Sequence, residues 1–163
     1  MMRGGAFVCT AILSLSLSLS LGCGDRHSVG STEVREYLNP KGLSATPYYT
    51  NVVKVGRFVF ITAQLSVDEK GEFVAKGDPA GQDRQIWHNL EIAMRAAGGS
   101  LQDIVQTTTF ITKPEYRRAV AETRRLLFPT NPPTTSRPIV VSEVTGSPEA
   151  LVSISVIAII PAR

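Results

Sequence analysis

The chain has 163 residues, of which 43% are hydrophobic and 19% are charged, and its formal net charge is +3. This composition is typical of a globular domain with a buried core and excludes a mostly disordered chain. The positive charge is scattered, and no run of lysine and arginine interleaved with aromatic residues occurs. The sequence therefore gives no support to nucleic-acid binding.

The first 23 residues resemble the leader of an exported protein. A short basic segment, residues 1–3, is followed by an apolar, uncharged run, residues 6–21. Because this run is shorter than a comfortable membrane span, we interpret residues 1–23 as a signal peptide or lipoprotein leader. We expect the protein to be exported, either periplasmic or membrane-anchored, or alternatively secreted.

Cys23 resembles the cysteine that is lipidated in bacterial lipoproteins. Gly22 before it fits that pattern, whereas Ser20 and Leu21 depart from it. Ordinary cleavage near the same place, or a start codon assigned too far upstream, are the alternatives. The other cysteine, Cys9, also lies in the leader, so the predicted domain contains no disulfide and no cysteine metal ligand.

Residues 24–45 mix Gly, Ser, Asn, Pro and charged residues without a sustained period, which predicts a linker. Within it, Tyr37 and Leu38 are the start of a candidate edge strand. We expect the folded domain to span residues 46–163.

Residues 52–64 are the most strand-like segment of the chain. They are β-branched and aromatic, are broken once at Gly56 and Arg57, and are apolar on both faces. This pattern predicts a central strand that is covered on both sides. The polar residues 68–72 that follow predict a hairpin turn into residues 73–75.

Two helices are predicted. Asp78 as N-cap and Pro79 at the first helical position begin the first helix, which ends at Gly98 and Gly99. The second begins near Pro114, carries an apolar stripe, and ends before Pro129. Strands are predicted over residues 104–112, 139–144 and 150–160.

The resulting order is β-β-α-β-α-β-β, an α+β domain with two helices on one face of a mixed sheet. Two helices cover only one face of such a sheet. Because the other face also carries apolar side chains, we expect it to be covered by association with further copies of the chain.

Few residues suggest chemistry. The two histidines, His27 and His88, lie in different predicted elements, so they predict no metal site. Neither a glycine-rich phosphate loop nor a nucleophile elbow is present. The remaining polar candidates for a site are Tyr49, Thr62, Asn89, Arg137 and Ser153.

Several short motifs resemble those of the RidA (YjgF-like) family in order and spacing. They are residues 49–64, Gln82-x-Arg84-Gln85 with Asn89-Leu90, residues 96–98, residues 103–108, Phe128-Pro129 and Pro132-Pro133. The resemblance covers nearly all of residues 46–160.

This resemblance implies a chorismate-mutase-like fold and a homotrimer around a β-barrel core, with ligand pockets between neighbouring subunits. It implies hydrolysis of reactive 2-imino or enamine acids to 2-oxo acids and ammonia, without a cofactor. In the family an arginine grips the substrate carboxylate, and a glutamate on the last strand helps to place the attacking water.

The chain departs from the family at several site positions. Thr62 and Ala63 stand where Ser and Gly are usual, and a second-helix Asn is replaced by Ala121. The carboxylate-binding Arg falls on Thr135 in an ungapped alignment, and Arg137 lies two residues later.

The glutamate of the last strand is replaced by Ser153. A serine does not act as the same base near neutral pH without an activating partner.

Two hypotheses follow. The first is a RidA-like imine deaminase in which Arg137 binds a carboxylate, with a pocket shaped by Tyr49, Thr62, Ala63, Asn89 and Thr135. The second is a non-catalytic RidA-like trimer that binds a small ligand or a protein in the cell envelope.

Overall fold

The computed structural model describes residues 33–135, 137–145 and 147–162. The predicted leader, Cys9, Cys23 and His27 lie outside the described residues. Among the described residues, no helix is both long and apolar enough to cross a membrane.

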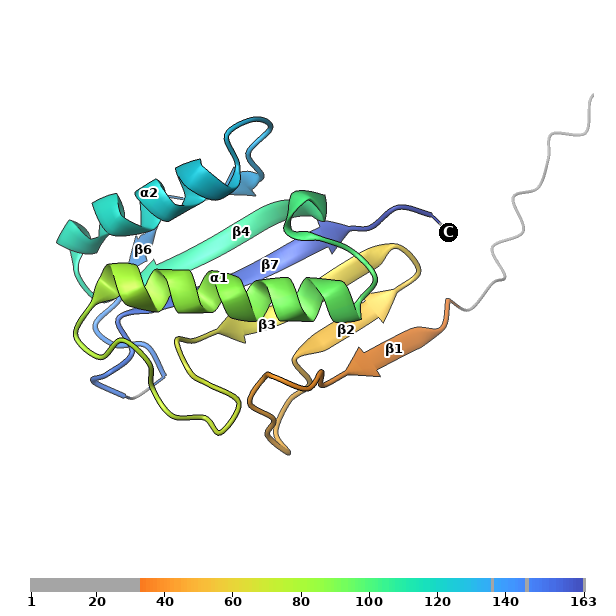
Figure 1. Ribbon diagram of the computed structural model, residues 1–163, viewed down its shortest axis with the longest axis horizontal. Helices are drawn as coiled ribbons and strands as arrows, with labels where there is room; N and C mark the ends of the chain where they lie inside the picture. The colour runs from red at the N-terminus through yellow and green to blue at the C-terminus, as the bar shows by residue number, and fades with distance from the viewer. Residues whose placement is uncertain (1–32, 136, 146, 163) are drawn as a thin grey trace, which may run out of the picture. The chain divides into compact units, whose positions relative to one another are not determined.

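One mixed sheet forms the centre of the domain (Figure 1). Its strands lie in the order β1-β2-β3-β7-β4-β5, and β6 also pairs with β4. The pairs β4–β5 and β4–β6 are parallel, whereas the others are antiparallel. The strands are β1 (Arg35–Leu38), β2 (Val52–Val55), β3 (Phe58–Gln64), β4 (Ile104–Ile111), β5 (Thr134–Thr135), β6 (Ile139–Val140) and β7 (Val152–Ile159).

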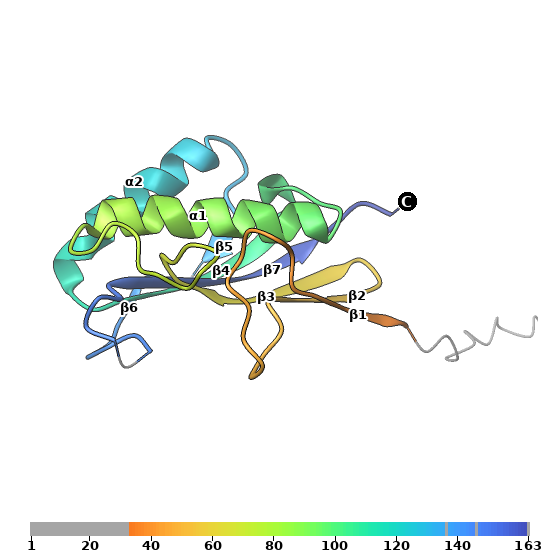
Figure 2. The ribbon, with the colours of Figure 1, turned by 60° about the horizontal axis from the view of Figure 1, so that its bottom comes forward.

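Helices α1 (Pro79–Ala96) and α2 (Arg117–Leu127) lie together on one face of the sheet (Figure 2). Asp78 caps α1 by accepting a hydrogen bond from the backbone N–H of Ala80. Two short 3₁₀ turns, Leu101–Asp103 and Pro114–Tyr116, precede β4 and α2. The predicted fold class, an α+β domain with two helices on one face of a mixed sheet, is confirmed.

The core lies between the helices and the sheet. The inward stripe of α1 is fully buried against alternate residues of β3 and β7, as the helical and strand periods require. The buried residues of these three elements include Ile86, Leu90, Ala93, Met94, Val59, Ile61, Val152, Ile154, Val156 and Ala158.

The start of the folded region differs from the prediction. The segment predicted as a linker contains β1, which includes the Tyr37 and Leu38 of the candidate edge strand but begins two residues earlier and ends at Leu38. It pairs with β2 from Arg35 opposite Val55 to Leu38 opposite Val52. Three of its four residues are exposed, so the sequence of this strand shows no alternation of apolar and polar residues from which it could be predicted. The sheet therefore begins at Arg35 and not at residue 46.

Other strand boundaries in the structure also differ from the predicted ones. Residues 52–64 form two strands that turn at Gly56, whose φ of 56° favours glycine. The predicted hairpin turn is present, because the N–H of Asp68 donates to the carbonyl of Glu72 at 3.0 Å and Val67 forms an antiparallel bridge with Phe73. Residues 73–75 nevertheless form no regular strand. Of residues 139–144, only Ile139–Val140 are a strand, and the two-residue β5 was not predicted.

The face of the sheet opposite the helices retains large apolar side chains. Tyr37, Val53, Phe60 and Ile157 stand in one row across β1, β2, β3 and β7. Phe58 and Phe60 are 47% and 44% exposed. This apolar face is the feature on which the expectation of association rests.

Candidate functional site

A hollow of about 340 Å³ lies beside the end of β3, and we call it the Tyr49 pocket. It falls at the small end of the volumes typical of small-molecule sites. Three chain segments and one residue of α1 line it: Ser44, Tyr49, Asn51, Ala63, Gln64, Leu65, Val67, Gly71, Phe73, Asn89, Thr145 and Ser147.

Asn89 fixes one wall of this pocket from α1. Its Nδ2 donates to the carbonyl oxygens of Leu65 and Val67, at 3.0 Å each. Its Oδ1 accepts from Nε2 of Gln85 at 3.0 Å. Because these bonds use the donors and the acceptor of a side chain that is only 2% exposed, Asn89 shapes the pocket and has little capacity left for a ligand.

Asn51 and Gln64 are a second group of buried amides that lines the same pocket. Nδ2 of Asn51 donates to the carbonyl of Ser44 at 2.9 Å, and its Oδ1 accepts from Nε2 of Gln64 at 3.3 Å. The backbone N–H of Asn51 donates to Oδ1 of Asn39 at 2.8 Å. We call Asn51, Gln64 and Asn89 the amide cluster.

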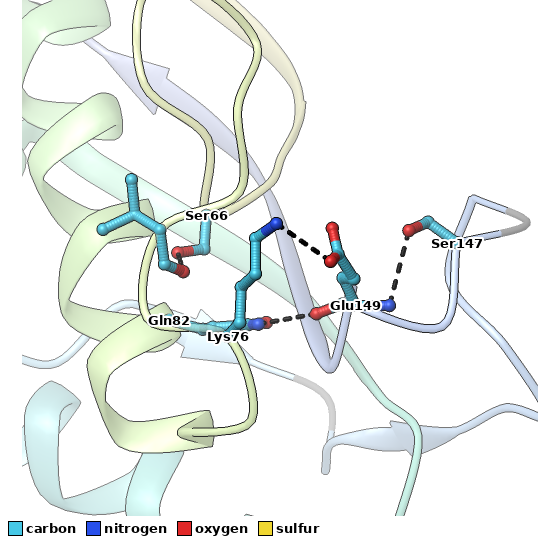
Figure 3. Close-up of polar contacts among 6 residues, drawn as sticks. Ser66, Lys76, Gln82, Ser147 and Glu149 are labelled. Carbon is cyan, nitrogen blue, oxygen red and sulfur yellow. Dashed lines mark hydrogen bonds and ion pairs between the residues drawn. The ribbon is translucent and has the colours of Figure 1, made fainter.

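The segment that supplies Thr145 and Ser147 is tied to α1 and to the loop before it (Figure 3). Nε2 of Gln82 donates to the carbonyl of Glu149 at 2.6 Å, and the N–H of Leu151 donates to Oε1 of Gln82 at 2.9 Å. Nζ of Lys76 lies 2.9 Å from Oε1 of Glu149, and this bond and charge raise the pKa of Lys76.

The structure brings some of the predicted site residues together. Tyr49, Ala63 and Asn89 line the Tyr49 pocket, and Tyr49 is 54% exposed. Thr62 precedes Ala63 and is half-buried; its backbone N–H donates to the carbonyl of Asn51. It is not among the residues that line the pocket.

Thr135 and Arg137 lie elsewhere. Thr135 belongs to β5, and its register row runs through Thr107 and Val156 to Ile61 of β3. Three strand spacings separate β3 from β5, or about 14 Å. The hydroxyls of Thr135 and Thr107 are 2.8 Å apart, and Arg137 is exposed after β5. A single chain therefore does not place this arginine in the Tyr49 pocket.

Ser153 is buried on β7 with a 2% exposed side chain, directly opposite Phe110 of β4. It is not among the residues that line the Tyr49 pocket.

Sequence reasoning missed a second buried polar group, between α1 and α2. Asp83 is 0% exposed, and neither of its carboxylate oxygens has a hydrogen-bond partner of good geometry. Burial raises the pKa of Asp83 to about 7, although Thr123, Arg124 and Trp87 lower it. Burial likewise lowers the pKa of Arg124, whose Nη2 donates to Oγ1 of Thr109 at 3.0 Å.

We call Asp83, Trp87, Thr123 and Arg124 the Asp83 cluster. Nε1 of Trp87 and Nε of Arg124 are also buried without a partner. No feature of the sequence predicted the Asp83 cluster, because an acidic residue within an amphipathic helix normally lies on the surface. Across the described residues, no group of three or more His, Cys, Asp or Glu side chains is arranged to hold a metal ion.

Comparisons with known proteins agree with the fold. Residues 40–160 match the model of the family described as Endoribonuclease L-PSP. A RutC family protein of Pyrococcus horikoshii is 36% identical over 63 residues, which are 39% of this chain and 50% of that protein. The 3-aminoacrylate deaminase RutC of Acinetobacter baylyi is 30% identical over 63 residues, again 39% and 50% of the two chains. These matches span about half the length of the curated relatives.

Solved structures extend the likeness to the whole domain. A conserved Rid family protein of unknown function from Yersinia pestis superposes with a TM-score of 0.72 at 27% identity, over 78% of this chain and 100% of that one. RidA from an Antarctic Psychrobacter gives a TM-score of 0.68 at 27% identity, over 76% and 98% of the two chains.

Proposed function

Because the chain belongs to the Endoribonuclease L-PSP family, we propose that it is a RidA-like hydrolytic deaminase of reactive 2-imino or enamine acids. The products are 2-oxo acids and ammonia, and the protein works as a homotrimer with its site between neighbouring copies. The relative named 3-aminoacrylate deaminase supports this activity, and the Rid family structures support the fold.

The observation that carries the proposal is the division of the site residues within one chain. The Tyr49 pocket lies at the end of β3, whereas Arg137 follows β5, on the far side of β7 and β4. Arg137 is exposed and free to face a neighbour, and the apolar sheet face gives copies a surface on which to associate. The arginine of one copy then meets the pocket of the next.

The chemistry requires water to add across the C=N bond. The water oxygen bonds to the imine carbon, a proton passes to the nitrogen, and collapse of the adduct expels ammonia and leaves the 2-oxo acid. Arg137 holds the substrate carboxylate in two parallel hydrogen bonds. Tyr49 offers a hydroxyl that orients the imine and the water, and Thr62 supports the site from beside Ala63. Imines hydrolyse unaided, so positioning alone gives a measurable rate.

Ser153 favours a second candidate, a non-catalytic trimer that binds a small ligand or a protein in the cell envelope. Ser153 is buried, and the family resemblance aligns it with the usual glutamate. It supplies no base near neutral pH. Under this candidate the same pocket binds without turnover.

The leader leads to a proposal about location. Residues 1–23 direct export, and Cys23 becomes the lipidated N-terminus. Mass spectrometry of the mature protein tests this: an acylated Cys23 supports both statements, a shortened, unmodified N-terminus contradicts the lipidation alone, and an intact N-terminus contradicts cleavage of the leader.

Imine hydrolysis by the full-length protein tests the activity. An L-amino-acid oxidase generates 2-imino acids in the presence of semicarbazide, which traps them, and the protein is expected to speed oxo-acid release and reduce trapping. Arg137→Ala is expected to abolish this effect, while Arg118→Ala, an exposed arginine of α2, leaves it intact. A correctly folded oligomer without effect on several amino acids contradicts the deaminase and favours the binding protein.

A further inference from the structure

A regular row of alternating charges lies on the exposed side of α2. Glu115, in the 3₁₀ turn that leads into the helix, is followed by Arg118, Glu122 and Arg125 in steps of three, four and three residues. Residues at these steps lie above one another on a helix, so the four side chains form one stripe about 15 Å long. All four residues are exposed, and α2 lies on the side of the sheet opposite to the apolar face (Figure 2). We call these four residues the Glu-Arg stripe.

Most of the charge in this stripe is not used within the chain. Nη2 of Arg125 lies 2.7 Å from Oε1 of Glu122, and these side chains are 68% and 58% exposed. Glu115 and Arg118 form no ion pair with any residue that the structure describes. The stripe is therefore open to charges from another molecule.

An apolar groove runs beside the stripe, between α2 and the start of α1. Its volume is about 490 Å³, and its uncharged lining consists of Ala80 of α1 and Ala119, Thr123 and Leu126 of α2. Leu126 is 65% exposed. A second helix laid along the stripe would remove this apolar surface from water, with ion pairs at its margin, as in paired helices.

The order of the charges is self-complementary in one orientation only. Glu115 and Arg125 lie five residues before and after Val120, and Arg118 and Glu122 lie two residues before and after it. A second α2, antiparallel to the first and related to it by a two-fold axis beside Val120, brings Glu115 of each copy opposite Arg125 of the other. The same axis brings Arg118 opposite Glu122, and each pair forms twice. A parallel second helix would instead place like charges opposite one another, which is repulsive.

We propose that the exposed side of α2 is an interface between two copies of this chain, which pair antiparallel through the Glu-Arg stripe. This surface is separate from the apolar sheet face on which the proposed trimer rests, so pairs of α2 helices join one trimer to another. The inference does not depend on the proposed activity. Because exposed ion pairs contribute little and are screened by salt, we expect a weak association that weakens further as the salt concentration is raised.

Sedimentation equilibrium of the full-length protein, over a wide range of concentrations, tests the proposal. Arg118→Glu and Glu122→Arg each place like charges opposite one another in two contacts. Each variant alone is therefore expected to associate at least about tenfold more weakly than the wild type. The double variant, with both substitutions in one chain, restores opposite charges across the axis without changing the net charge. It is expected to associate within about threefold of the wild type. An equal mixture of the two single variants is expected to do the same, because each supplies the charge that the other lacks.

Arg117→Glu is the matched control. Arg117 is an exposed arginine of the same helix, and the substitution makes the same change in charge as Arg118→Glu. It lies about 100° around the helix from Arg118 and outside the stripe, so its loss is expected to leave the association within about threefold of the wild type. All variants carry the same leader and the same apolar sheet face, so differences among them report on α2 alone. Circular dichroism verifies the fold of each variant.

Three results overturn the inference: a wild-type mass that does not rise with concentration, unchanged association of folded Arg118→Glu, or no recovery in the double variant and the mixture. Binding of the wild type to vesicles of phosphatidylserine and phosphatidylcholine, without self-association, assigns the stripe to a membrane surface and also overturns it. The proposed function fails separately, because α2 variants that no longer pair are expected to hydrolyse imines as the wild type does.

Discussion

The amide cluster beside the Tyr49 pocket and the Asp83 cluster between the helices are both buried and polar, but they are satisfied to different degrees. Asn89 uses both amide donors and accepts one bond at its oxygen, with all three hydrogen bonds at 3.0 Å. Asp83 has no well-formed hydrogen bond to either carboxylate oxygen. A satisfied buried group stabilises the structure around it, whereas an unsatisfied one opposes folding.

The difference shows that burial alone does not reveal what a polar residue does. Asn89 and Asp83 lie on the same helix and are similarly hidden from solvent. One organises a pocket wall, and the other makes the packing of α1 against α2 depend on a proton.

The largest effect is expected from Asn89→Ala. The substitution leaves the carbonyls of Leu65 and Val67 and Nε2 of Gln85 without their partner, which costs about 2–4 kcal/mol of unfolding free energy. Chemical denaturation measures the loss. Gln85→Ala, which removes only one of these bonds, is the control and is expected to cost about 1 kcal/mol. A loss below about 0.5 kcal/mol for Asn89→Ala would show that the amide cluster does not stabilise the pocket wall.

Asp83→Asn is expected to act in the opposite direction and only at high pH. The pKa of Asp83 is about 7 in the folded protein, against an ordinary value of 3.8. The folded state therefore holds a proton that the unfolded state has released. The contribution of this protonation to the free energy of unfolding is fully present below about pH 4 and is lost as the pH rises to about 7. The full shift in pKa corresponds to a loss of up to about 4 kcal/mol.

The variant removes this dependence, so at pH 8 it should be more stable than the wild type by about 1–3 kcal/mol, with no comparable gain at pH 4. Denaturation curves from pH 4 to pH 8 measure both proteins. Equal slopes of stability against pH would contradict the assignment of the titration to Asp83.

Thr123→Val sharpens the same comparison with a smaller change. The Thr123 hydroxyl lowers the pKa of Asp83, so its loss should move the pH dependence of stability to higher pH. At pH 8 the variant should be about 1 kcal/mol less stable than the wild type. At pH 4 the two proteins should match, and a loss of equal size at both pH values would indicate a packing defect.

Lys76→Ala is expected to have no measurable effect on the melting temperature. Its ion pair with Glu149 is exposed, with 56% and 42% of the two side chains accessible, and such pairs contribute little. The segment before β7 remains held by Gln82, which is buried. A clear drop in the melting temperature would show that the ion pair, and not Gln82, anchors this wall of the pocket.

The sequence predicted the fold class well because its long elements carry strong periodic signals. The apolar alternation of residues 150–160 and the capped amphipathic helix after Asp78 both appear, within two residues, as β7 and α1. Strand β5 was not predicted, whereas β1 and β6 were predicted with the wrong bounds. They are exposed or too short for a period, and pairing with β2 or β4 decides their conformation.

The candidate site was predicted only in part. Tyr49, Ala63 and Asn89 meet in the pocket, but Gln64, Asn51 and Phe73 come from segments whose proximity is set by tertiary contacts. Local sequence patterns do not predict such tertiary contacts. Whether Arg137, Thr135, Thr62 and Ser153 contribute to a complete site depends on neighbouring copies and stays a prediction.

Complementation between two inactive variants tests the central claim, a site shared between copies, most directly. Tyr49→Ala and Arg137→Ala are each expected to be inactive in imine hydrolysis. When the two are unfolded, mixed in equal amounts and refolded together, about a quarter of the sites across all the randomly assembled trimers combine an intact Tyr49 with an intact Arg137. The account predicts that activity returns to about that fraction of the wild-type value, measured against co-refolded wild-type protein. Inactive mixtures of correctly assembled, mixed oligomers would contradict a site shared between copies.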